Sequence, residues 1–191
     1  MIDAGYMPKI ISAKPFLTPF GQIWLKNEHI EKIYSVSGCT SSIPIDNYIS
    51  LWKHNQYWVF DSLDIAKELV EANCSKEEIT NVTYLFYTEY EEQFDEKQKK
   101  WEPINIEPSF GYDIKLQDNK IFRGYDIVSF SCKNKPECSP LSCNSLSDKV
   151  EVNKYCLLDD FDIAKFIIGL MNSKLGEPGP YRIFGVYEII P

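Results

Sequence analysis

Four cysteines in the second half of the chain are the residues with the clearest potential to hold a metal ion. They are Cys132, Cys138, Cys143 and Cys156, with five, four and 12 residues between successive members. Paired zinc ligands usually stand two to four residues apart, because a short turn then presents both sulfurs to one tetrahedral ion. The spacing here is looser, and buried or loop thiols are the competing interpretation. We therefore expect no cofactor, with zinc at these cysteines as the alternative.

A thiol nucleophile is the second chemistry that these residues could support. Cys138 or Cys143 on an exposed loop would need a neighbouring base. The chain has two histidines, His29 and His54, both in its first half and neither in a recognisable signature. No phosphate-binding glycine loop is present either. We assign no catalytic residue, and a cysteine-based enzyme or metal protein remains the alternative function.

An acidic and aromatic segment follows position 86 and favours a binding role instead. Carboxylates steer association with a basic protein, and aromatic side chains supply binding energy at interfaces. The chain has a formal net charge of −8, which repels phosphate backbones, so we expect no nucleic-acid partner. The leading hypothesis is a non-enzymatic acidic module that binds a basic protein partner; a solvated strand end is the competing interpretation. The expected contact residues are Tyr87, Glu89, Tyr90, Glu91 and Glu92.

An internal repeat defines the elements that must position these residues. Segment 55–67 returns 98 residues later as 153–165, with seven of 13 pairs identical. Each copy predicts a strand (57–60 and 155–158), a helix N-cap (Asp61 and Asp159), a helix, and a second strand (82–88 and 181–189). The carboxylates that cluster at each strand-to-helix junction are explained as caps and partners of the helix dipole.

The fold that we predict is α+β, with two tandem pseudo-symmetric units. Each unit is a hairpin, strand, helix and strand, and its helix packs on an antiparallel or mixed sheet. The hairpins are expected at 21–25 with 30–37 and at 112–116 with 120–130, and the strands 57–60 and 155–158 are expected to be central. The units span 1–104 and 105–191, as two domains or one continuous domain. The charged segment 89–101 between them is either a linker or a hairpin that extends strand 82–88.

The second predicted helix carries an apolar stripe of helical period. A stripe of this width is typical of a helix face that packs on a core. The stripe consists of Ile163, Phe166, Ile167, Leu170 and Met171.

Three short motifs in the second half resemble a pattern in short uncharacterised bacterial proteins. They are Gly-Tyr-Asp-Ile-Val at 124–128, Ser-Pro-Leu-Ser-Cys-Asn at 139–144, and the segment 153–164. The resemblance covers about the last 70 residues and implies a bacterial origin, but it transfers no activity. By analogy with small acidic bacterial proteins, we consider an immunity-type inhibitor of a basic toxin as the most concrete form of the binding hypothesis.

Composition predicts the compartment. No apolar run approaches the roughly 20 residues that span a bilayer, and the first residues lack a signal-peptide pattern, so we expect a cytoplasmic protein without a membrane partner. The six cysteines are then expected to be reduced. A third functional hypothesis, a structural or assembly subunit, rests on the internal repeat, and a homo-oligomer is left open.

Overall fold

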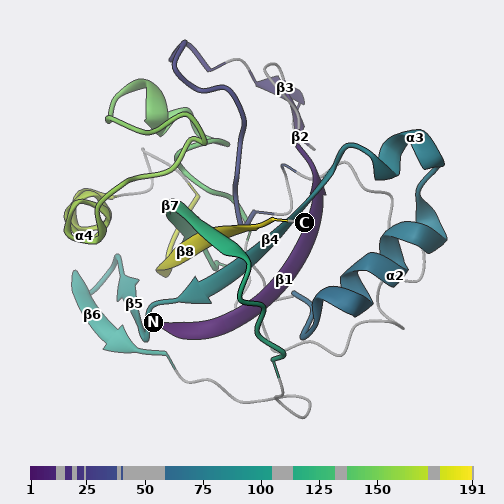
Figure 1. Cartoon of the computed structure of the whole chain (residues 1–191). Coiled ribbons are helices and arrows are strands. Elements are labelled where there is room, and N and C mark those ends of the chain that lie inside the picture. The colour runs from purple at the N-terminus through teal and green to yellow at the C-terminus, as the bar shows by residue number, and fades with distance from the viewer. Residues whose placement is uncertain are drawn as a thin grey trace.

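The computed structural model describes residues 1–11, 16–18, 21–23, 25–37, 40, 59–104, 114–131, 137–171 and 177–190. Its main feature is a six-stranded antiparallel sheet with a few helices against it, so the predicted α+β class is confirmed (Figure 1). The strand order is β1-β4-β8-β5-β6, and β7 pairs with β8. A two-stranded ribbon, β2 with β3, lies apart from this sheet. Strands from both predicted units therefore belong to one sheet.

The strands have the following bounds. In the main sheet they are β1 (Ile2–Ile10), β4 (Val82–Glu89), β5 (Glu92–Asp95), β6 (Lys100–Pro103), β7 (Lys120–Ser129) and β8 (Tyr181–Ile189); the ribbon is β2 (Phe16–Thr18) and β3 (Gly21–Ile23). The predicted strands 82–88, 120–130 and 181–189 are confirmed. Segment 89–101 forms the hairpin of β5 and β6 rather than a linker.

Helices α2 and α4 each begin one residue later than the predicted caps imply. They are α2 (Leu63–Asn73), α3 (Lys76–Ile79) and α4 (Phe161–Leu170), with a short 3₁₀ turn, η2 (Leu146–Asp148). The Ser62 side chain accepts a hydrogen bond from the backbone N–H of Ile65, and Asp160 does the same for Ile163. Ser62 and Asp160 are thus the N-caps, not the expected Asp61 and Asp159, because their side chains reach the third N–H of each helix.

Two glycines allow β1 and β7 to approach single residues of other segments of the chain. Gly5 in β1 and Gly124 in β7 have φ values of +131° and +137°, and both lie at irregularities in strand pairing. The residues that follow them, Tyr6 and Tyr125, form isolated antiparallel bridges with Phe60 and Leu158. A Cβ on either glycine would lie 2.5 or 2.8 Å from the carbonyl oxygen of the bridged residue, so only glycine fits.

The predicted central strands are therefore corrected. Segment 155–158 contains a turn and one bridge to Tyr125, and it flanks β7 at the edge of the sheet. Of segment 57–60, positions 57 and 58 lie outside the described residues, and Phe60 forms one bridge to β1. Among the described residues of these segments, Val59, Phe60, Leu157 and Leu158 are buried, and the backbone of each segment approaches one glycine closely.

Segment 30–37 is also not a strand. Tyr34 N–H donates to the carbonyl of Tyr155 at 3.0 Å, and the rings of these two residues lie 4.6 Å apart. Segment 30–37 was predicted to pair with 21–25. Instead it contacts residues 154–155, and β3 pairs with β2. Conversely, β1 was not predicted, because Gly5 and Pro8 are residues that weaken a strand assignment.

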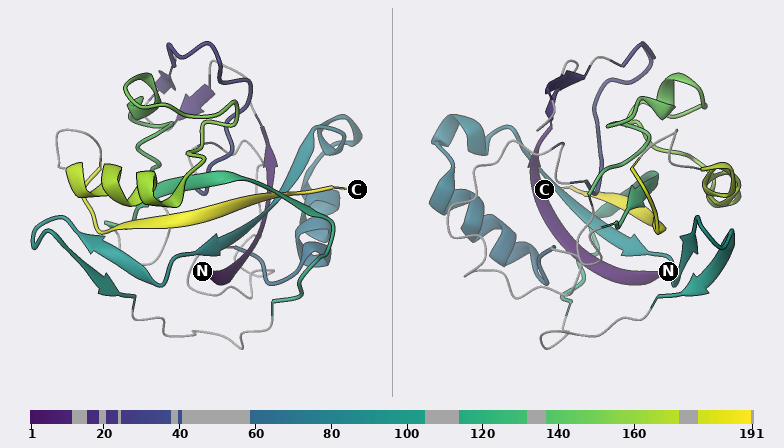
Figure 2. Two further views of the ribbon diagram at one scale, coloured as in Figure 1. Left: turned by 60° about the vertical axis from the view of Figure 1, so that its left-hand side comes forward. Right: turned by 180° about the vertical axis from the view of Figure 1, so that it is seen from behind.

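Apolar cores lie on both faces of the sheet. In β7, Val128 belongs to the core with α2, whereas its neighbour Ile127 belongs to the core with α4; in β8, Phe184 and Ile183 divide in the same way. Successive strand residues point to opposite faces, so α2 and α4 cover the two faces (Figure 1). Figure 2 shows β7 and β8 side by side next to α4. Within the described residues, no helix is long and apolar enough to cross a membrane.

Candidate protein-binding surface

The first two residues of the predicted contact set lie in the interior. Tyr87 and Glu89 have no exposed surface. The Tyr87 hydroxyl donates to the carbonyl of Ser35 at 3.1 Å, and the Arg182 guanidinium donates to Glu89 Oε1 at 3.1 Å. Both positions belong to β4, which has β1 on one side and β8 on the other. Their side chains hold the sheet together and are not presented at the surface.

Tyr90 and Glu92 both contact the amine of Lys165, which belongs to α4. Lys165 Nζ lies 4.8 Å from the Tyr90 ring centroid and 4.7 Å from that of Trp101. It also donates to the Tyr90 hydroxyl at 3.2 Å and lies 3.8 Å from Glu92 Oε2. Cation–π attraction and the ion pair attach α4 to the β5–β6 hairpin. Part of the Glu92 charge is consequently balanced within the molecule.

Glu91 is the fifth predicted contact residue and has an accessible carboxylate. Its side chain is 66% exposed, and its Oε1 lies 3.9 Å from the N-terminal amine. The Tyr90 and Phe161 rings pack at 4.9 Å, which brings this segment next to the start of α4. Three more exposed carboxylates stand there. We define the acidic surface as Glu91, Glu92, Asp159, Asp160 and Asp162.

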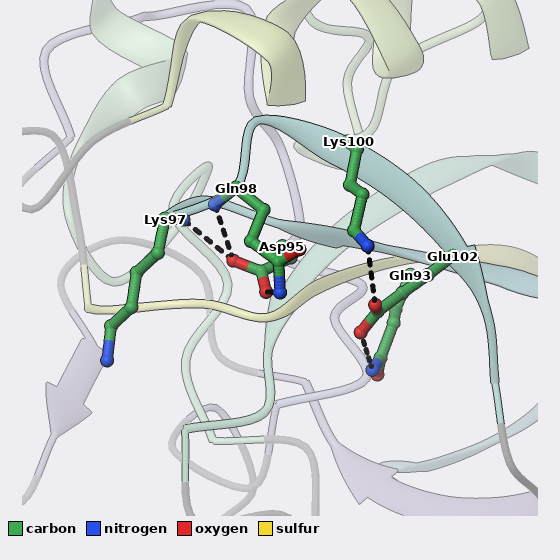
Figure 3. A network of polar contacts seen from close by, with 6 residues as sticks. All are labelled: Gln93, Asp95, Lys97, Gln98, Lys100 and Glu102. Carbon is green, nitrogen blue, oxygen red and sulfur yellow. Dashed lines mark hydrogen bonds and ion pairs between the residues drawn. The ribbon is translucent and has the colours of Figure 1, made fainter.

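The hairpin beside this surface is held by its own polar contacts (Figure 3). Asp95 Oδ1 accepts from the backbone N–H groups of Lys97 and Gln98 at 2.8 and 3.0 Å. These hydrogen bonds lower the pKa of Asp95, so the carboxylate stays charged in the turn. Gln93 donates across the hairpin to Glu102, which also lies 4.0 Å from Lys100. The turn thus has a defined conformation with lysines at its tip.

The apolar stripe of α4 divides into two parts. Ile167 and Met171 are buried in the core, as predicted. Ile163, Phe166 and Leu170 are not: their exposed fractions are 51%, 68% and 57%. The stripe is wider than the surface that β7 and β8 offer, so the prediction that all five residues face the core is wrong for these three.

The cysteines occupy several environments. Cys138 and Cys156 are buried, and Cys143 is half-buried with its sulfur 3.8 Å from the Ser37 hydroxyl oxygen. Cys132 lies outside the described residues. In the part of the chain that the structure describes, no three His, Cys, Asp or Glu side chains are grouped so that they could hold a metal ion.

A buried charged network is the polar feature that sequence reasoning missed. Asp126 has no exposed surface; its carboxylate accepts from Ser139 Oγ at 2.6 Å, Ser35 Oγ at 2.8 Å and Val36 N–H at 2.9 Å. Burial raises the pKa of Asp126 to about 6, although these donors and Lys9 oppose the shift. The buried Lys9 amine donates to the carbonyls of Ser35 and Ser37. The network joins β1, segment 35–37, β7 and the loop at 139.

The motif residues of the second half have structural roles here. Gly124, Tyr125 and Asp126 provide the bulge, the bridge and the buried carboxylate described above. Asn153 Nδ2 donates to the Arg123 carbonyl at 2.8 Å and to Asp159 at 2.7 Å, while its Oδ1 accepts from Tyr155 N–H at 2.9 Å. One asparagine thus orders the loop that leads into α4.

Comparison with known proteins gives no assignment: no protein-family model, no curated protein and no solved structure matches this chain.

Proposed function

We propose that this protein is a non-enzymatic acidic module that binds a basic protein partner. The contact region is the acidic surface, with Glu91 and Glu92 at its centre. Tyr87 and Glu89 are buried and are not part of this region, whereas the Tyr90 hydroxyl donates to Glu92 Oε2 at 2.5 Å and positions it. The most concrete form of the proposal is an immunity-type inhibitor, whose carboxylates cover the cationic substrate site of a bacterial toxin.

The observation that carries the proposal is the joining of two distant carboxylate groups. Glu91 and Glu92 follow β4, whereas the three aspartates precede and begin α4 about 70 positions later. The Tyr90–Phe161 contact and the Lys165 ion pair bring the two segments together. Like charges in proximity repel each other and cost stability, and a cationic partner would relieve that repulsion while gaining a faster rate of association.

A charge-reversal experiment tests this proposal. The immobilised chain is incubated with bacterial extract at about 0.05 M salt and washed at about 0.5 M, where the Debye length falls below ~5 Å. We expect a basic protein to be retained and then released. The variant Glu91→Lys/Glu92→Lys should lose at least about tenfold of this retention. The matched control is Glu68→Lys/Glu71→Lys, which makes the same charge change on exposed positions of α2.

Two results would contradict the proposal: equal loss of retention in the variant and the control, or retention that salt does not weaken. Circular dichroism of both variants establishes that each is folded before the comparison is made.

We also propose that the two halves of the chain are pseudo-symmetric units. The exposed and buried positions of α2 and α4 nearly coincide at the repeat offset of 98, and Phe60 and Leu158, which bridge Tyr6 and Tyr125, are separated by the same offset. If Gly5 and Gly124 serve the same purpose, replacing either by alanine should lower the free energy of unfolding by similar amounts. A cost confined to one glycine would argue against equivalent units.

A further inference from the structure

The exposed part of the α4 stripe is not required by the scaffold. Ile163, Phe166 and Leu170 lie at i, i+3 and i+7, so they form one continuous row along the outer face of the helix. At the repeat offset of 98, α2 places Glu68 where α4 has Phe166, and both positions are exposed. The same helical position thus accepts a charged residue in one copy, and the apolar row in α4 needs another explanation.

The two ends of this row carry opposite charges. Asp159, Asp160 and Asp162 are exposed at the N-terminal end of α4. At its C-terminal end, Lys99 donates to the carbonyl of Met171 at 2.8 Å. This contact places the β5–β6 turn there. Lys97 of the same turn and Lys100 at the start of β6 are also exposed, and Lys100 lies 4.0 Å from Glu102 (Figure 3). The row therefore runs from an acidic end to an end where three lysines outnumber the carboxylates of Asp95 and Glu96.

We propose that this surface is the interface of a two-fold homodimer, in which α4 packs antiparallel to α4 of a second copy. An antiparallel arrangement apposes the aspartates of one copy and the lysines of the other at both ends of the row. A uniformly basic helix would complement the aspartates but would be repelled by the lysines. The bipolar charge pattern favours a second copy, because a two-fold interface is self-complementary.

The size of the contact sets its strength. A ten-residue helix is about 15 Å long, so the contact lies at the small end of specific interfaces. Three large apolar side chains from each copy form its centre, which is the usual location of the residues that dominate binding energy. A reversible dimer with a Kd on the order of 10 μM is expected.

Dimerisation does not require the proposed partner, although both contacts use Asp159, Asp160 and Asp162, so that the two should compete. The dimer is held mainly by apolar contact and should persist at about 0.5 M salt, whereas binding of a basic partner should not. Failure of one proposal is consequently distinguishable from failure of the other.

Sedimentation equilibrium of the full chain from about 1 to 200 μM, a range that brackets the expected Kd, tests the proposal. We expect a monomer–dimer equilibrium that Phe166→Glu weakens by roughly 30-fold or more, since the substitution occurs twice in the interface. Leu170→Glu should act in the same direction. The control, Ala72→Glu, adds the same charge at the exposed position of α2 that corresponds to Leu170. It should leave the equilibrium unchanged. A monomer at all concentrations, or a dimer that Phe166→Glu does not weaken, would overturn the proposal.

A charge exchange tests the antiparallel arrangement. Asp162→Lys and Lys97→Glu should each weaken the dimer several-fold, because each apposes like charges at both ends. The double variant restores opposite charges and should recover most of the wild-type affinity. Additive weakening in the double variant would exclude this pairing of ends.

Discussion

The buried carboxylate of Asp126 makes the stability of this protein depend on pH in an unusual direction. Most carboxylates stabilise a fold as the pH rises, because their pKa is lower in the folded state. For Asp126 the pKa rises from 3.8 to about 6 on folding, since its burial in the sheet outweighs its three hydrogen-bond donors and Lys9. The folded state therefore binds a proton in the window between these two values while the unfolded state does not. The contribution of Asp126 to stability must increase as the pH falls through 6 towards 4.

The size of the effect follows from the two pKa values. Each pKa unit corresponds to about 1.4 kcal/mol, so a shift of roughly two units contributes up to ~3 kcal/mol. At pH 4 the unfolded carboxyl is already partly protonated, which reduces the difference between pH 7 and pH 4 to about 2 kcal/mol. Asp126→Asn has nearly the same shape and no titration, so it removes this term and leaves the other carboxylates as they are.

The assay is urea unfolding of the wild type and Asp126→Asn, followed by tryptophan fluorescence at several pH values from 4 to 7. The free energy of unfolding of the wild type minus that of the variant should increase by about 2 kcal/mol as the pH falls over this range. A difference that does not change with pH would refute the raised pKa. A difference that shrinks on acidification would show that the charge of Lys9 outweighs burial and lowers the pKa below 3.8.

Three further substitutions test the scaffold. Gly124→Ala should lower the free energy of unfolding by roughly 1–3 kcal/mol, because φ is +137° and the new Cβ would lie 2.8 Å from the Leu158 carbonyl oxygen. Gly169→Ala in α4, where a Cβ meets nothing within 4 Å, should instead raise the free energy of unfolding by up to about 1 kcal/mol. Both variants are measured by thermal and urea unfolding, and the same effect for the two substitutions would contradict this account. Arg182→Met should cost about 3–5 kcal/mol, because it removes the guanidinium from the buried Glu89 carboxylate. Adding Glu89→Gln should recover part of that loss, and a purely additive double variant would show that the pair does not interact.

The local elements could be predicted from short-range sequence patterns. Helix α2 follows from apolar residues at helical spacing after a capping residue, and β4, β7 and β8 follow from runs of β-branched and aromatic residues. The caps were misplaced by one residue, since adjacent polar residues at 61–62 and 159–160 both suit the N-cap by type. Backbone geometry selects between them. Strand β1 was hidden by Gly5, whose positive φ has a purpose only once Phe60 lies against it.

The surface was less predictable than the elements. From the sequence we expected Tyr87 and Glu89 to be accessible, because nothing in segment 82–92 indicates that β4 has a strand on each side. Asp126 reads as an ordinary strand residue, and its donors come from segments that are 13 to 91 positions away. Likewise, the apolar period of α4 predicts a buried face, but it does not tell how much of that face the sheet can cover.

The sequence by itself therefore determined the α+β class, the helix of each copy, and the excess of carboxylates, because these depend on neighbours within a few positions. The tertiary structure decided which carboxylates are buried and which are exposed, and it joined Glu91 and Glu92 to the start of α4. It also left Phe166 and Leu170 uncovered, with acid at one end and base at the other. Such features depend on the pairing of distant strands and on the area that a packed sheet can bury.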